Sequence, residues 1–179
     1  MNIHRRPHTL AALLMLSGVP SMAHADPFRI SIDQGTVNVV VAAATMTVPY
    51  EISHAARGQC VPEVAITPEP DGVRIRHTRN CHGSGRDEGT VFTLTLSAAQ
   101  AYDLHLKAGR INIDGGWGEG GFGTFEGRVS VGGIRSRRPG LDITIERRRL
   151  VGAVARYGHA DADGGGLTTT VSYGEINLL

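Results

Sequence analysis

The sequence predicts an all-β protein in which mixed N-terminal strands lead into a C-terminal stack resembling a β-solenoid or β-roll. Apolar and polar residues alternate along most of the extended segments, which is typical of strands with one buried face. Of the 24 glycines, 17 lie between Gly109 and Gly174, where a short glycine-led unit recurs. The only helix-like window, residues 97–102, is too short to be stable by itself.

The first 25 residues carry the features of a secretory signal peptide. Arg5 and Arg6 precede an apolar stretch over residues 10–19, and residues 23–25 read Ala-His-Ala, a small-x-small cleavage pattern. We therefore expect cleavage between Ala25 and Asp26 and export to the periplasm or the medium. No apolar run reaches the ~20 residues of a membrane-spanning helix, so we expect no transmembrane segment.

Residues 26–179 are expected to form a single all-β domain, because a chain of 179 residues fits one domain. Its first half, residues 28–106, reads as strands of ordinary length joined by loops, with a hairpin turn at residues 68–72. The alternation predicts strands at residues 28–32, 36–41, 45–52, 61–66, 73–77, 91–96 and 102–106.

The second half, residues 109–179, is built from units in which β-branched or leucine residues alternate with small polar ones. These units begin at Gly109, Gly127, Gly140 and Gly174, and residues 150–155 and 167–172 are further extended candidates. A single unit buries too few apolar side chains to be stable, so the units must stack on one another. The chain ends directly after a unit, and an unpaired last strand would permit edge-to-edge self-association.

Cys60 and Cys81 are the only cysteines, and both lie in the part expected to be exported. A pair in an oxidising compartment most simply forms one disulfide, which would contribute ~3 kcal/mol by restricting the unfolded chain. A metal site with His77 or His82 is a weaker alternative, since zinc requires four ligands at short spacing. A redox-active pair is also weaker, because the C-x-x-C spacing is absent.

Residues 116–121 formally match the dinucleotide-binding pattern G-x-G-x-x-G. The segment that follows is extended, so no helix N-terminus is available for a pyrophosphate. We interpret these residues as a wide loop in which Trp117, Phe122 and Phe125 close over the stack. An exposed aromatic patch that binds a partner is the alternative interpretation.

Neither the acidic nor the histidine residues form a recognisable catalytic or metal-binding pattern. Asp161 and Asp163 open a polar turn, and an EF-hand loop that begins at Asp161 would need ligands where Gly165 and Ser172 stand. A calcium ion shared by Asp161, Asp163 and loop carbonyls is the alternative interpretation of this turn. His105 lies on a predicted strand opposite two leucines and is expected to face solvent. We therefore predict no catalytic residue, no resident metal and no cofactor.

Two arginine clusters are the best indication of a partner. They consist of Arg135, Arg137 and Arg138, and of Arg147, Arg148 and Arg149. In a stacked fold these clusters could align into a stripe that binds an anionic envelope polymer or a lipid surface. A solvated charged face is the alternative. The formal net charge of the chain is only +1, which argues against a nucleic-acid binder.

Three segments resemble the DUF4097-type putative adhesin family, whose members are exported or membrane-tethered bacterial proteins. The resemblance lies in TLTLSA at residues 93–98, LHLKAGRINI at residues 104–113 and SYGEINL at residues 172–178. It implies a strand-rich start that leads into the rungs of a β-helix-like stack. The family carries no established catalytic residues, so the resemblance implies none for this chain.

The sequence as a whole predicts a non-enzymatic exported protein of the bacterial envelope, an adhesin-like binding or structural module. The alternative is a small periplasmic enzyme or a metal-dependent module that uses the loop between His77 and His82.

Overall fold

The computed structural model describes residues 26–42, 49–57, 63–79, 89–117, 121–137, 143–147, 152–158 and 165–179. These residues contain strands and turns but no helix, so the all-β prediction is confirmed. The strands are β1 (Phe28–Ala42), β2 (Tyr50–Arg57), β3 (Glu63–Glu69), β4 (Gly72–Arg79), β5 (Gly89–Ser97), β6 (Tyr102–Asp114), β7 (Thr124–Ser136), β8 (Thr144–Arg147), β9 (Ala153–Gly158) and β10 (Gly166–Leu178). The signal peptide predicted for residues 1–25 and both cysteines lie outside the described residues.

The described strands form one sheet in the order β2-β5-β1-β6-β10-β7-β9-β8, to which β4 adds by pairing with β1, and β3 by pairing with β4. Its centre is four long parallel strands, β1, β6, β10 and β7. The strands at the ends, β2, β3, β9 and β8, all pair antiparallel with their neighbours.

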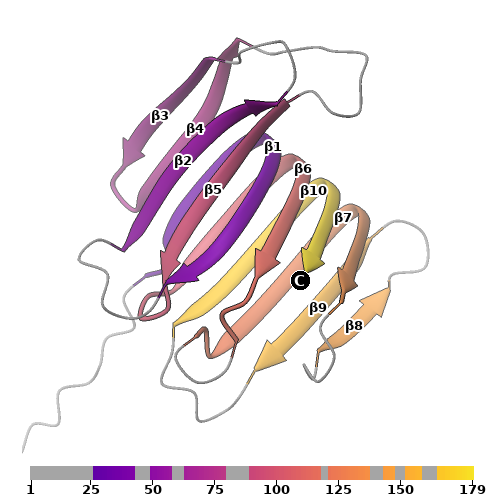
Figure 1. Cartoon of the computed structure of the whole chain (residues 1–179). Helices are drawn as coiled ribbons and strands as arrows, with labels where there is room; N and C mark the ends of the chain where they lie inside the picture. The colour runs from indigo at the N-terminus through magenta and orange to yellow at the C-terminus, as the bar shows by residue number, and fades with distance from the viewer. Residues whose placement is uncertain are drawn as a thin grey trace, which may run out of the picture.

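Each of the four central strands bends sharply at a glycine and folds back over itself (Figure 1). These glycines lie in register across the sheet, and we call them the bend row: Gly35, Gly109, Gly174 and Gly132. Their φ angles of +133° to +143° favour glycine, since other residues rarely adopt them. The bend turns one sheet into two facing layers.

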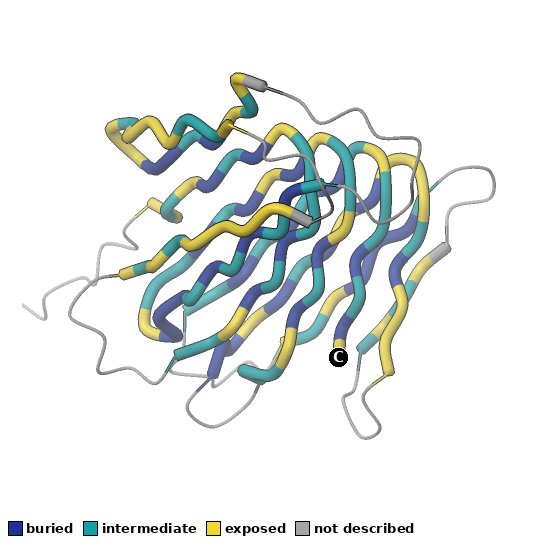
Figure 2. The backbone as a smooth tube through the Cα atoms, turned by 45° about the horizontal axis from the view of Figure 1, so that its top comes forward, coloured by how far each residue is buried: buried dark blue, intermediate teal, exposed yellow. Residues whose placement is uncertain are grey.

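The first layer contains the strand segments before the bend row, together with β4, β3, β9 and β8. The second layer contains the segments after the bend row, together with β5 and β2. Buried residues alternate with exposed or half-buried ones along the long strands of both layers (Figure 2). This alternation places the buried side chains between the layers.

The bend explains a phase shift in the hydrophobic pattern. In β6, Leu104 and Leu106 are buried before the bend, and Ile111 and Ile113 are buried after it. Leu106 and Ile111 are an odd number of residues apart, so a flat strand would place them on opposite faces. The bend at Gly109 returns both side chains to the same interior.

The bend also accounts for the strand boundaries that the sequence missed. The predicted strands at residues 28–32 and 36–41 are two arms of β1, and the predicted strand at 167–172 and the Gly174 unit are two arms of β10. Gly127, predicted to begin a unit equivalent to that of Gly109, lies inside the first arm of β7 instead. Gly140 lies outside the described residues.

The predicted β-solenoid or β-roll stack is not confirmed. The strands form one sheet that departs from chain order, because β10 lies between β6 and β7. The prediction that the last strand is unpaired was therefore wrong: β10 pairs along its length with both neighbours. The described sheet is an open one, and its ends are formed by β2, β3, β8 and the second arm of β7.

Two sets of polar contacts join the layers. The Tyr102 hydroxyl donates a hydrogen bond to the Pro49 carbonyl oxygen and accepts one from the Ser97 N–H at 3.1 Å. On the side of β4, His77 Nε2 lies 2.7 Å from Thr90 Oγ1 on β5. Burial raises the pKa of the Tyr102 phenol, so this hydroxyl stays neutral and able to donate.

Candidate functional site

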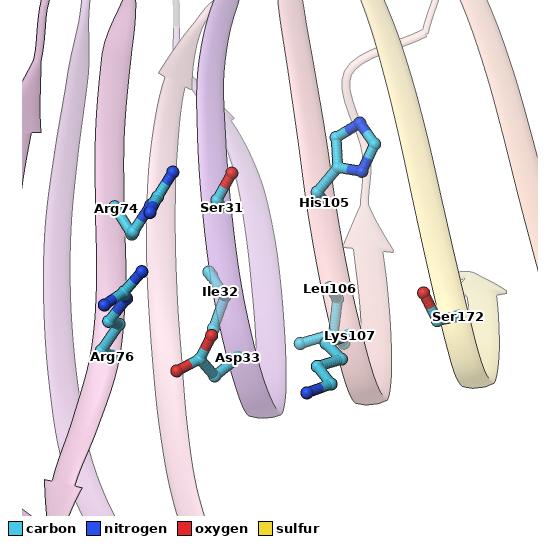
Figure 3. A pocket seen from close by; sticks show the side chains of 9 residues that line it. All are labelled: Ser31, Ile32, Asp33, Arg74, Arg76, His105, Leu106, Lys107 and Ser172. Atoms are coloured by element: carbon cyan, nitrogen blue, oxygen red, sulfur yellow. The ribbon is translucent and has the colours of Figure 1, made fainter.

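A shallow polar depression of about 290 Å³ lies on the outer face of the first layer. It is lined by residues from four neighbouring strands: Ser31, Ile32, Asp33, Arg74, Arg76, His105, Leu106, Lys107 and Ser172 (Figure 3). Alternation places the polar side chains here. In β1, for example, Ile30 and Ile32 are buried, so Ser31 and Asp33 face outward.

The depression carries an excess of positive charge. Arg74 is neutralised by Glu69, whose Oε1 lies 2.8 Å from its Nε. Within the described residues, Arg76, Lys107 and Asp33 take part in no ion pair. Two cations and one carboxylate therefore remain, an excess of one positive charge, and Asp33 lies between Arg76 and Lys107 (Figure 3).

His105 projects from β6 into this depression. Its Nε2 lies 3.2 Å from a carboxylate oxygen of Asp103, and its side chain is 48% exposed, as the alternation of the strand predicted. Among the described residues, neither Ser31 nor Ser172 is hydrogen-bonded to the imidazole. The depression thus contains a histidine–carboxylate pair but lacks a hydroxyl nucleophile held against it.

The predicted arginine clusters are only partly described. Arg135 and Arg137 follow the bend of β7, and Arg135 Nε lies 3.9 Å from a carboxylate oxygen of Glu175. Arg147 ends β8, which β9 separates from β7. Arg138, Arg148 and Arg149 lie outside the described residues. Alignment of the two clusters into one stripe stays a prediction.

The histidine proposed for the alternative metal-dependent module, His77, lies at the interface between the layers. Desolvation lowers its pKa below the usual value near 6.5, a nearby His54 acts in the same direction, and Asp33 opposes them. His82 lies outside the described residues. No group of three or more potential metal ligands occurs in the part of the chain that the structure describes.

The aromatic residues of the glycine-rich loop pack against the core, as the first of the two interpretations predicted. Phe122 is fully buried and Phe125 nearly so. The Trp117 ring centroid lies 5.0 Å from that of Phe125 and 5.8 Å from that of Tyr157. These rings therefore cover the end of the first layer between β6, β7 and β9.

The outer face of the second layer carries a row of asparagines across β1, β6 and β10. Asn112 Nδ2 donates to Asn38 Oδ1 at 2.9 Å, and Asn177 Nδ2 donates to Asn112 Oδ1 at 3.0 Å. In the next strand Arg135 occupies the paired position. The row therefore runs toward the edge formed by the second arm of β7.

Comparisons with known proteins give one structural likeness. No family model and no curated protein matches the chain. A crystal structure described as that of a putative cell adhesion protein from Clostridium sporogenes aligns with 87% of this chain and 93% of its own length. The identity is 10% and the TM-score 0.35, which is too low to establish a shared fold. The resemblance to the DUF4097-type family stays a prediction from sequence.

Sequence reasoning missed the depression although it predicted the strands that carry it. Arg74, Arg76 and Lys107 occupy outward positions next to buried residues in the predicted strands or just beyond them. The missing information was that β4, β1 and β6 are neighbours. Their sequence separation gives no sign of this pairing.

Proposed function

We propose that this protein is a non-enzymatic exported protein of the bacterial envelope that binds an anionic polymer on the outer face of its first layer. The observation that carries the proposal is the pair of cations, Arg76 and Lys107, that face one open depression without an ion-pair partner among the described residues. Unpaired cations on an open sheet face attract carboxylate or phosphate groups. This proposal replaces the two arginine clusters as the first place to look for the partner.

Binding is favoured over catalysis by the geometry of the depression. Its histidine is half exposed and lacks a hydrogen-bonded hydroxyl among the described residues, and the depression is shallow. Catalytic sites usually pair a nucleophile with a base and exclude water. A shallow face that spans four strands suits a long ligand lying across the strands.

Export and the family resemblance complete the proposal. The signal-like residues 1–25 favour the periplasm or the cell exterior, and the glycine-bent parallel strands are compatible with the stacked fold that the DUF4097-type resemblance implies. The described residues contain no helix that could span a membrane. A binding or structural role at the envelope, such as adhesion, is the function we infer from these features together.

The proposal is tested by binding of the purified mature protein to polygalacturonate, with neutral dextran as the control polymer. Arg76→Gln/Lys107→Gln should weaken binding, and added salt should weaken that of the unchanged protein. Arg128→Gln is the matched control, because Arg128 lies on β7 outside the depression and pairs with Glu126 at 2.6 Å. It should bind as the unchanged protein does.

Three outcomes would overturn the proposal. The first is equal binding by the double variant and the unchanged protein. The second is loss of binding only in a variant with glutamine at positions 147–149, which would place the site at the arginine cluster. The third is binding to phosphatidylglycerol vesicles but not to the polymer.

A further inference from the structure

The second arm of β7 is an open sheet edge unlike the other ends of the two layers. The described ends of the first layer are antiparallel strands, β3 on one side and β8 on the other, and the second layer begins with antiparallel β2. β9 pairs with β7 only from Thr124 to Val129, before the bend (Figure 1). Beyond the bend, the side of β7 away from β10 faces no described strand.

The backbone groups that this edge offers follow from the pairing with β10. The Arg137 N–H donates to the Leu178 carbonyl oxygen at 2.9 Å, so Arg137 faces β10. Strand geometry alternates, so Gly133 and Arg135 face β10 as well, whereas Ile134 and Ser136 direct their N–H and C=O groups away from it. An added strand would bond to these two residues.

The side chains along this arm define what the added strand should carry. Ile134 is buried on the inner face, so the adjacent position on an incoming strand calls for an apolar residue. Arg135 is on the outer face, with a side chain 70% exposed, and its nearest carboxylate, in Glu175, also binds Arg110. A Cβ at Gly133 would meet no atom within 4 Å, so the face of the sheet is open at this position.

We propose that the second arm of β7, Gly133–Ser136, accepts an extended peptide of a partner protein in which apolar residues alternate with Asp or Glu. The peptide adds one strand to the second layer. Its apolar residues extend the core beside Ile134, and its acidic residues bind Arg135 and Arg137 on the outer side. Charge complementarity selects such a peptide over a second copy of this chain, since two copies would bring their arginines together.

Amide hydrogen exchange with a synthetic peptide of alternating valine and glutamate tests this proposal. The peptide should slow exchange at Ile134 and Ser136 and leave Gly133 and Arg135 unchanged, because the latter amides already bond to β10. Arg135→Gln/Arg137→Gln should weaken binding roughly two- to thirtyfold, as expected for two exposed ion pairs. Arg128→Gln is the control, because Arg128 lies on β7 before the bend and pairs with Glu126, and it should leave the protection of Ile134 and Ser136 unchanged. Protection is measured at the edge amides themselves, so binding of the acidic peptide in the depression does not contribute to it.

A peptide with the same side chains but N-methylated backbone amides should not bind, since it cannot complete the ladder. Equal protection by this peptide would show that side-chain charge alone is responsible, and it would overturn the proposal. Slow exchange at Ile134 and Ser136 in the free protein would also overturn the proposal, whether or not the exchange rate depends on protein concentration. In that case the edge is already covered by the chain itself or by a second copy.

Discussion

His77 shows how one side chain can make the two layers sensitive to pH. Its imidazole joins β4 to Thr90 on β5, and burial lowers its pKa in the folded state. The unfolded chain therefore binds a proton more readily, so acid favours unfolding. The contribution of His77 is complete above about pH 6.5 and is lost as the pH falls from there through the folded-state pKa.

We expect the protein to lose stability between about pH 7.5 and about pH 5.5, and His77→Gln to lose less over the same interval. Urea unfolding at the two pH values measures the difference. His105→Gln is the control, because His105 lies on the outer face and joins no layers. Identical losses in His77→Gln and the unchanged protein would contradict the assignment.

For an individual site residue, the sequence predicts which face of its own strand it occupies, but not which residues of other strands lie beside it. Outward-facing His105 follows from its position between two leucines in one strand. That it shares a depression with Arg76 does not, because the two residues are on strands joined only through β1. A residue's exposure depends on local alternation, whereas its neighbours depend on strand pairing.

The bend row shows what a glycine contributes to a whole strand. A Cβ at Gly132 would lie 1.7 Å from the Gly174 carbonyl oxygen, and the φ of Gly132 is +133°. Gly133 is next in the chain, has no positive φ and has open space where its Cβ would be. Substitutions at these two adjacent glycines therefore distinguish the backbone conformation that the bend requires from the general effect of replacing a glycine.

Gly132→Ala should lower the free energy of unfolding by more than about 1 kcal/mol, because alanine strains this backbone and meets a carbonyl oxygen. Gly133→Ala should leave it unchanged or slightly raised, since alanine costs less backbone entropy than glycine. Urea unfolding of both variants measures this. A similar effect of the two substitutions would mean that the close packing of the bend row is not needed.

The disulfide between Cys60 and Cys81, next to the β3–β4 hairpin, is a prediction that is based on the sequence. Cys60 and Cys81 lie three residues before Glu63 and two residues after Arg79, and Glu63 and Arg79 are paired across β3 and β4. Both cysteines lie outside the described residues, so the disulfide stays a prediction from sequence.

At the scale of the whole molecule, the sheet crosses the boundary between the two sequence halves. β6 pairs with β1 on one side and with β10 on the other. Ile176 in β10 is fully buried between the layers. Stability lost at this position should therefore affect both halves of the chain.

Ile176→Ala should cost about 2–5 kcal/mol, as is usual for a buried isoleucine. Native-state hydrogen exchange should show the same loss of protection in β1 as in β6, β10 and β7. Tyr173→Ala, at a side chain that is largely exposed, serves as the control and should cost much less. If β1 keeps its protection in Ile176→Ala, the chain consists of two independent units rather than the single domain that we predict.

The sequence by itself determined the all-β class and the outward and inward faces of most strands. These properties depend on side chains two residues apart in one strand, which local alternation records. Only the tertiary structure decided that the bends join two layers, that β10 lies between β6 and β7, and that cations from β4 and β6 share one depression. Such features arise where segments far apart in the sequence pair with each other. Packing over the whole core determines which strand a parallel strand pairs with.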